Sequence, residues 1–206
     1  MSKRLIPILL VVAMLFSVFT ACGKKKTPKD EISTAREQIE DLPVQLDDKT
    51  EALLDKAENI DTGNVPTLAP ANIKVTVDLP EGWEEDKDST NVVVAYIKDT
   101  NIFNLMQSYA YSEVNYAKDL AKLEMEQIKE YFEEAAYSEL EAVTVAGLEG
   151  CKFSMELAIT ESMKQTQMYV YFEKGGNYYK VMSAWFSNDE EGKEDIEHIL
   201  ASMKIE

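Results

Sequence analysis

Residues 73–206 are predicted to fold as an α+β domain, an antiparallel β-sheet of about six to seven strands with helices packed on it. Three observations predict this class. Alternating apolar and polar runs of strand length recur along this part of the chain. Hairpin-type turns such as Gly175-Gly176-Asn177 separate several of them. Two longer stretches carry apolar residues at helical spacing, and strand runs joined by hairpins around such helices are typical of α+β domains.

A secretory leader precedes the domain. Lys3 and Arg4 form a positive start, an apolar run follows from Leu5 to Phe19, and small residues lead to Cys22. That order is characteristic of a signal peptide, which we predict over residues 1–21. The alternatives are an ordinary secreted protein with an incidental cysteine, and an uncleaved anchor helix, for which the apolar run is at the short limit.

The end of this leader resembles the lipobox of bacterial lipoproteins. Its residues are Phe19-Thr20-Ala21-Cys22, with a small residue before the cut and a thiol after it, although Phe19 departs from the usual leucine. The resemblance implies that Cys22 is the lipidation site, takes a diacylglyceryl group and becomes the mature N-terminus. Two acyl chains suffice for stable anchoring. The expected location is therefore the cell membrane, lipid-anchored and facing the extracytoplasmic side.

The mature chain is strongly acidic. Without residues 1–21 it has 19 Lys and Arg against 38 Asp and Glu, a net charge of −19. Nucleic-acid binding needs a basic surface, so this class of function is excluded. An acidic body is repelled by an anionic membrane, which favours a domain held away from the surface by a tether.

We expect the tether in residues 22–72, which are polar and contain four prolines. Two short helical patterns lie inside it, ending at Leu42 and at Ile60. Each is about three turns long, too short to be stable alone in water. A partly helical spacer is the favoured interpretation, and packing on the domain or on a partner is the alternative.

The first half of the domain is predicted to contain three strands and a helix. Residues 73–79 alternate and stop at a Pro80-Glu81-Gly82-Trp83 turn, and residues 91–98 and 102–111 form a hairpin. The longest helical pattern follows at about 115–136. Its apolar side comprises Ala117, Leu120, Ala121, Ile128, Tyr131, Phe132 and Ala135.

The second half is predicted to contain four strands and a closing helix. The strands are 141–146, 151–159, 165–173 and 178–186. Ser187 or Asn188 is expected to cap the helix, which carries Ile196, Ile199, Leu200 and Met203 at helical spacing. Cys151 lies on the apolar face of its strand, so we expect a buried, inert thiol and no structural disulfide.

Several segments together are similar to PsbP-like domains, including DcrB-like bacterial lipoproteins. They are Leu79-Pro80-Glu81-Gly82-Trp83, Val143-Thr144-Val145-Ala146-Gly147, Tyr178-Tyr179-Lys180-Val181 and Ser202-Met203-Lys204-Ile205. The resemblance covers residues 73–206. It implies an α/β/α sandwich on an antiparallel sheet, a mostly non-enzymatic accessory or interaction role outside the cytoplasm, and no catalytic residues that carry over.

The sequence offers no catalytic, cofactor or metal motif. His198 is the only histidine and lies off the apolar stripe of its helix, and a metal site needs further ligands. The chain has no GxSxG, HExxH or phosphate-binding loop. Acidic clusters at 84–88 and 189–195 lack the ligand pattern of a calcium loop, so we expect solvated faces. We therefore expect no enzyme, no cofactor and no metal.

Aromatic residues on two strands form the candidate ligand or partner surface. They are Tyr169, Tyr171, Tyr178 and Trp185. Cross-strand packing in the core is the favoured interpretation, and a face left partly open by a helix is the alternative. The leading hypothesis is a lipid-anchored, extracytoplasmic, non-enzymatic interaction or accessory module with an envelope protein as partner. The second is a small-ligand binding lipoprotein using an aromatic groove beside the sheet, and a hydrolase is third.

Overall fold

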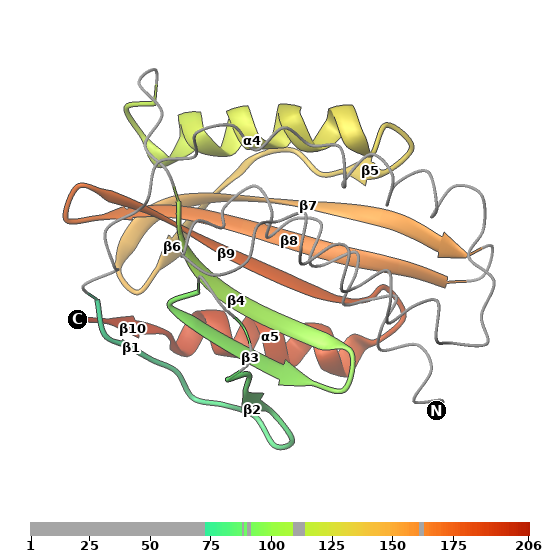
Figure 1. Cartoon of the computed structure of the whole chain (residues 1–206), viewed down its shortest axis with the longest axis horizontal. Helices are drawn as coiled ribbons and strands as arrows, with labels where there is room; N and C mark the ends of the chain where they lie inside the picture. Colours follow the sequence, from blue (N-terminus) through green and yellow to red (C-terminus); the bar gives the residue numbers. More distant parts are fainter. Residues whose placement is uncertain (1–72, 88, 90–91, 109–113, 161–162) are drawn as a thin grey trace. The chain divides into compact units, whose positions relative to one another are not determined.

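The structure is a computed structural model, and it describes residues 73–206 except 88, 90–91, 109–113 and 161–162 (Figure 1). The leader, Cys22 and both helical patterns of the tether lie outside the described residues, so what we expect of them remains a prediction.

The domain is built on one antiparallel sheet. Its neighbouring strands follow the order β2-β3-β4-β9-β8-β7-β5, and β6 also pairs with β7. Every pair is antiparallel, so the predicted α+β class is confirmed. The strands are β2 (Glu84–Glu85), β3 (Val94–Lys98), β4 (Asn101–Ser108), β5 (Ala136–Tyr137), β6 (Glu141–Val145), β7 (Leu148–Thr160), β8 (Met163–Lys174) and β9 (Asn177–Phe186).

Tight turns fix the register of this sheet. Gly175 and Gly176 have φ of +61° and +77° and join β8 to β9, as the sequence predicts. Only such positive φ values match a two-residue turn to the twist of the strands, which is why glycine is suited to the position. Asp99, with φ of +53°, turns β3 into β4, so the predicted hairpin there is also confirmed.

Helices α4 (Ala117–Tyr131) and α5 (Glu190–Ser202) pack on opposite sides of the sheet (Figure 1). Helix α4 lies over β7 and β8, and α5 lies over β9. An apolar cluster of buried residues lies on the α5 side. It includes Trp83, Phe103, Leu105, Val145, Met168, Val170, Phe172, Tyr179, Val181, Trp185, Ile196, Ile199 and Met203.

The N-cap of α5 is Asp189, whose side chain accepts a hydrogen bond from the Gly192 amide at 2.9 Å. The predicted cap, Ser187 or Asn188, is therefore wrong. Ser187 belongs to the strand edge instead, because its amide donates to the Lys164 carbonyl at 2.9 Å and its hydroxyl bonds Thr166 at 2.8 Å.

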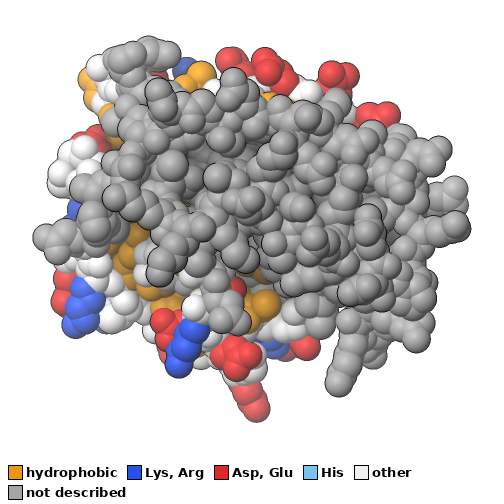
Figure 2. Space-filling model, viewed as in Figure 1, with side chains coloured by type: hydrophobic (Ala, Val, Ile, Leu, Met, Phe, Trp, Pro, Cys, Tyr) orange, Lys and Arg blue, Asp and Glu red, His pale blue; other side chains and the backbone are white. Residues whose placement is uncertain are grey.

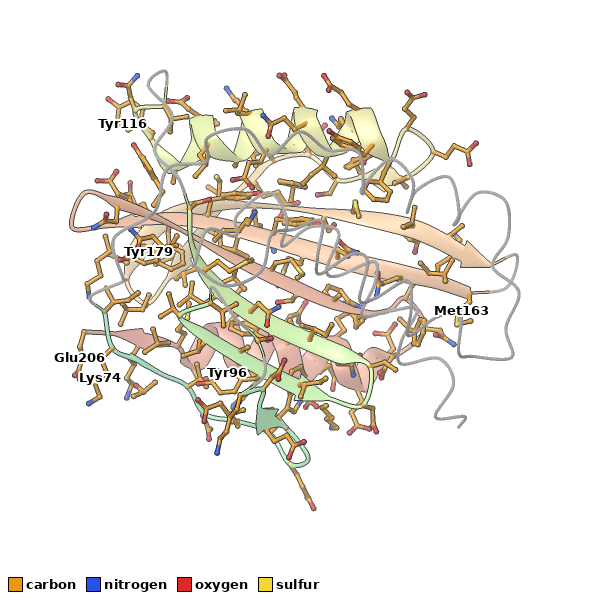
Figure 3. All side chains as sticks on the ribbon, viewed as in Figure 1. Lys74, Tyr96, Tyr116, Met163, Tyr179 and Glu206 are labelled. Carbon is orange, nitrogen blue, oxygen red and sulfur yellow. The ribbon has the colours of Figure 1, made fainter. Side chains whose placement is uncertain are left out.

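A separate two-stranded ribbon joins the start of the domain to its end. Strand β1 (Val75–Thr76) pairs antiparallel with β10 (Lys204–Ile205). The backbones of Lys74 and Glu206 exchange hydrogen bonds of 2.9 and 3.1 Å, and the two residues lie together in Figure 3. The described domain therefore begins beside its C-terminal end.

Candidate functional site

The sheet face below α4 is the candidate site, because it buries polar side chains. Strand alternation places Gln165, Gln167, Tyr169 and Tyr171 of β8 on this side, and all four are 0% exposed. Phe153 of β7 stacks on Tyr169 with ring centroids 5.0 Å apart. The alternate residues of β8 face α5 and join the apolar cluster there.

The centre of the site is a charged network around Glu124 of α4. Lys180 of β9 lies 2.7 Å from its Oε2 atom, and the Tyr171 hydroxyl donates to the same oxygen at 3.0 Å. The Ser108 hydroxyl of β4 donates to Oε1 at 3.0 Å. Side chains from one helix and three strands thus meet at one carboxylate, which we call the Glu124 network.

This network is sealed from water. The side chains of Lys180 and Glu124 are only 3% and 7% exposed. A buried ion has lost its hydration, so it is tolerated only where partners replace that hydration. Three protein donors do so at the two oxygens of Glu124. The network therefore connects α4 to the sheet through buried polar contacts.

Burial and charge keep the tyrosines of this face protonated. Burial raises the pKa of Tyr171 well above its usual value, and the negative charge of Glu124 raises it further. The pKa of Tyr169 is raised for the same two reasons. Both hydroxyls are therefore donors at every physiological pH.

A second row of polar groups continues from Tyr169 along β8. The Tyr169 hydroxyl donates to Gln167 at 2.6 Å, and the Gln167 amide donates to Gln165 at 2.8 Å. The row ends at Nε2 of Gln165, which is buried and has no hydrogen-bond partner among the described residues. A buried donor without a partner has lost its hydrogen bonds to water, so it destabilises the folded state.

Sequence reasoning missed Glu124, although a signal for it exists. Residue 124 falls on the same side of α4 as Leu120, Ala121 and Ile128, which are all buried. A carboxylate on the apolar stripe of a helix needs a buried partner. Lys180 is the matching signal, since it is the one cation between the otherwise uncharged residues 178 and 186.

The four predicted aromatic residues do not form one surface. Tyr178 lies on the α4 side with Tyr169 and Tyr171, whereas Trp185 faces α5. The reason is parity, because residues seven apart in one strand point to opposite faces. All four are buried, at 0% for Tyr169 and Tyr171, 8% for Tyr178 and 7% for Trp185.

Cys151 is buried, as predicted, and it lies next to α4. Its thiol lies 3.7 Å from the Ala117 carbonyl, and burial raises its pKa to about 11. A thiol with so high a pKa is mostly protonated at neutral pH and therefore a poor nucleophile.

The acidic cluster at the start of α5 is not simply a solvated face. Asp195 accepts hydrogen bonds from the Trp83 indole at 2.9 Å and from Lys98 at 2.7 Å, and Glu191 lies 2.8 Å from Lys98. Burial opposes ionisation of Asp195, but the hydrogen bonds from Lys98 and Trp83 outweigh it and lower the pKa. The expectation of a solvated face therefore holds for Glu190, Glu191 and Glu194, which are exposed, and is wrong for Asp195, because β3 brings a lysine to the helix.

His198 lies on the surface of α5, and its Nε2 atom is 3.1 Å from Asp78. In the described part of the chain, no group of three or more His, Cys, Asp and Glu side chains is placed to hold a metal ion. The described residues also include no helix that is long and apolar enough to cross a membrane.

Comparisons with solved structures bear on the fold. LpqN, described as involved in cell envelope biogenesis of Mycobacterium tuberculosis, has a TM-score of 0.51 at 11% identity, covering 66% of this chain and 86% of that chain. The cyanobacterial PsbP of Synechocystis has a TM-score of 0.47 at 12% identity, covering 70% and 98%. No protein-family model matches the chain. No curated protein matches it either.

The similarity to LpqN shows a shared fold and says nothing of activity. A PsbP protein is also among the structures that this chain resembles. The DcrB-like assignment remains a prediction.

Proposed function

We propose that this chain is a lipid-anchored extracytoplasmic protein whose domain, residues 73–206, is a non-enzymatic interaction or accessory module of the cell envelope. The observation that carries the proposal is the leader, an apolar run from Leu5 to Phe19 that ends in Thr20-Ala21-Cys22. A diacylglyceryl group on Cys22 supplies the two acyl chains that stable attachment needs.

The geometry of the described domain supports an interaction role over a catalytic one. The buried charges of the Glu124 network are satisfied by protein donors, so they serve packing. Many exposed acidic side chains lie along the edge of the molecule that carries α4 (Figure 2). A net charge of this sign favours partners with basic surfaces and disfavours direct contact with anionic lipid.

The alternative, a small-ligand binding lipoprotein, depended on an aromatic groove. Its four aromatic residues are buried and are divided between the two faces of the sheet. We therefore retain the interaction module as the proposal.

Substitution of the two cysteines tests the anchor. Cys22→Ala is expected to move the protein from the membrane fraction to the soluble extracytoplasmic fraction. Cys151→Ala is the matched control, because this thiol is buried in the domain, and it should leave the protein in the membrane. A Cys22→Ala protein that stays membrane-bound would show that the lipoprotein assignment is wrong.

Crosslinking in intact cells with Cys22 kept, followed by mass spectrometry, tests the accessory role. One envelope protein recovered in stoichiometric amount supports it. Recovery of no enriched protein from the anchored form contradicts it and returns attention to small ligands.

A further inference from the structure

We propose that β6 is an interaction edge, through which the sheet of this chain pairs antiparallel with the same edge of a second copy. The inference is independent of the proposed function. It rests on the backbone groups that β6 leaves unpaired, and on the way in which the other edges of the sheet differ from β6.

The turn after β6 fixes which backbone groups of this strand bind β7. Residues 146–147 have φ of +52° and +78° and form a two-residue hairpin turn between Val145 and Leu148. Such a turn is closed by a hydrogen-bonded pair, and bonded and non-bonded pairs then alternate along an antiparallel ladder. Val145 and every second residue before it therefore bind β7. Ser154, an even number of residues after Leu148, agrees with this alternation, because its carbonyl accepts a hydrogen bond from the Ser138 amide at 2.9 Å.

Ala142 and Thr144 are the residues of β6 that point the other way. Their amide and carbonyl groups face away from β7. In the part of the chain that the structure describes, β6 pairs only with β7, and these groups make no other backbone hydrogen bond. Both residues are exposed. The outer edge of β6 therefore offers donors and acceptors to a further strand.

The other described edges of the main sheet have features that prevent such pairing. At the opposite edge, β2 has only two residues, and both are glutamates. Strand β5 also has only two residues, and the register of β7 is interrupted between Ala158 and Thr160. Short strands, charges and bulges are the usual means by which proteins protect sheet edges. Strand β6 has five residues, and its last four, Ala-Val-Thr-Val, are uncharged, contain no proline and favour extended structure.

This edge is complementary to itself. When two β6 strands pair antiparallel about Val143, Ala142 of one copy lies opposite Thr144 of the other, and the two-fold symmetry repeats the pair. Both residues have outward backbone groups, so both pairs are hydrogen-bonded. Val143 then lies opposite Val143, and Glu141 lies opposite Val145. No two like charges are directly opposed across the strands, which is the arrangement that would destabilise the pairing.

The charge of the chain makes the association weak and dependent on salt. A net charge of −17 opposes the approach of two copies, but charges further apart than about 8 Å are screened at physiological ionic strength. Pairing through one short strand buries little surface, as in weak and transient interfaces. We therefore expect a reversible dimer that forms faster at higher salt, with one sheet continuous across the two-fold axis.

Disulfide trapping of the full mature chain with Cys22→Ala tests the register, since the remaining thiol, Cys151, is buried. One chain carries Ala142→Cys and the other Thr144→Cys. Opposite residues of a hydrogen-bonded pair have Cα atoms about 5.5 Å apart, which suits a disulfide, whereas identical residues lie on a diagonal of about 7–8 Å, which does not. The equimolar mixture should therefore form a disulfide dimer at least about tenfold faster than either variant alone. Tyr116→Cys, at a position that is 70% exposed, gives the rate of random collision.

A proline tests whether the copies meet through their backbones. Adding Thr144→Pro to the Ala142→Cys chain removes an outward amide from the second residue pair and leaves the cysteine pair intact. We expect the trapping rate of the mixture to fall to that of the collision reference. Thr144→Ala in the same chain keeps the amide and should keep the rate. Because this amide does not bind β7, the proline and alanine variants should have the same melting temperature.

Either of two results would overturn the proposal. If the mixture is trapped no faster than the Tyr116→Cys reference, a second copy is excluded as the occupant of β6, and a strand of another protein becomes the hypothesis. If the single variants are trapped as fast as the mixture, or if Thr144→Pro leaves the rate unchanged, the copies do not meet in the antiparallel register.

Discussion

On the α5 side of the sheet the packed side chains are almost all apolar, whereas the α4 side buries a lysine, a glutamate and two tyrosine hydroxyls. Apolar packing is non-directional and tolerates changes of shape that conserve volume. A buried ion pair has a large desolvation cost and is stable only in one geometry. We therefore expect the packing of α5 to depend on the apolar surface area that it buries. We expect the Glu124 network to fix α4 in one specific position.

Removal of Glu124 is the strongest test of this difference. Glu124→Ala leaves Lys180 charged and unpaired at 3% exposure, so the free energy of unfolding should fall by about 3–5 kcal/mol. Urea unfolding measures it. Glu126→Ala, exposed on the same helix, is the control and should stay within about 0.5 kcal/mol.

The loss in Glu124→Ala has two possible sources, the missing ion pair and the unpaired charge that is left on Lys180. A double substitution separates them. Glu124→Met with Lys180→Met removes both charges, and we expect a stability near or above that of the parent. If the double variant is as unstable as Glu124→Ala, the pair stabilises the fold outright and the comparison with α5 is lost.

The α5 side should respond to volume instead. Ile196 is 0% exposed in the apolar cluster, so Ile196→Ala should cost about 3 kcal/mol in the free energy of unfolding. Ile196→Leu conserves volume and should cost less than about 1.5 kcal/mol. Equal losses for the two variants would mean that shape, not volume, is decisive on this side.

Removal of single tyrosine hydroxyls compares the two sides of the sheet more finely. Tyr171→Phe takes one donor from the buried Glu124 carboxylate, and we expect a loss of about 1–2 kcal/mol. Tyr179→Phe is the matched change on the α5 side. There the ring of Tyr179 stacks on the ring of Phe172, with the two centroids 5.6 Å apart. It should cost less than about 0.5 kcal/mol, because the ring contact is kept, and similar losses for both variants would contradict a special role of the α4 side.

The apolar side of the molecule was the easier to predict from sequence. Alternation located the long strands, and Gly175-Gly176 located the turn between β8 and β9. The two-residue strands β2, β5 and β10 are too short for any periodicity, so they exist only through tertiary pairing. Strand β7 is longer than predicted, beginning at Leu148, since a tight turn at Ala146-Gly147 lets pairing start at once.

The polar groups were harder because their partners are remote in sequence. Glu124 and Lys180 are 56 residues apart, and Trp83 and Asp195 are 112 apart. A stripe position can show that a charge is buried, but not which residue pairs with it. Strand parity, in contrast, was available from the sequence and separates Trp185 from Tyr178.

We expect the smallest effect on stability at the partly exposed ion pair between Asp195 of α5 and Lys98 of β3. Because its pKa is lowered in the folded state, Asp195 contributes stability above the ordinary aspartate pKa of about 3.9, and this contribution is lost as the pH falls through the folded value. Asp195→Asn should therefore flatten the decrease of unfolding free energy below about pH 4. Urea unfolding across the acid range measures that slope.

The neighbouring carboxylate shows whether the effect comes from the pair or from charge alone. Glu194 is exposed in the same turn of α5, and Glu194→Gln removes the same charge without touching Lys98 or Trp83. We expect this variant to keep the acid slope of the parent. If both variants flatten it equally, the acid sensitivity reflects the overall negative charge of the domain. The Lys98 contact would then be one more surface ion pair of little net energy.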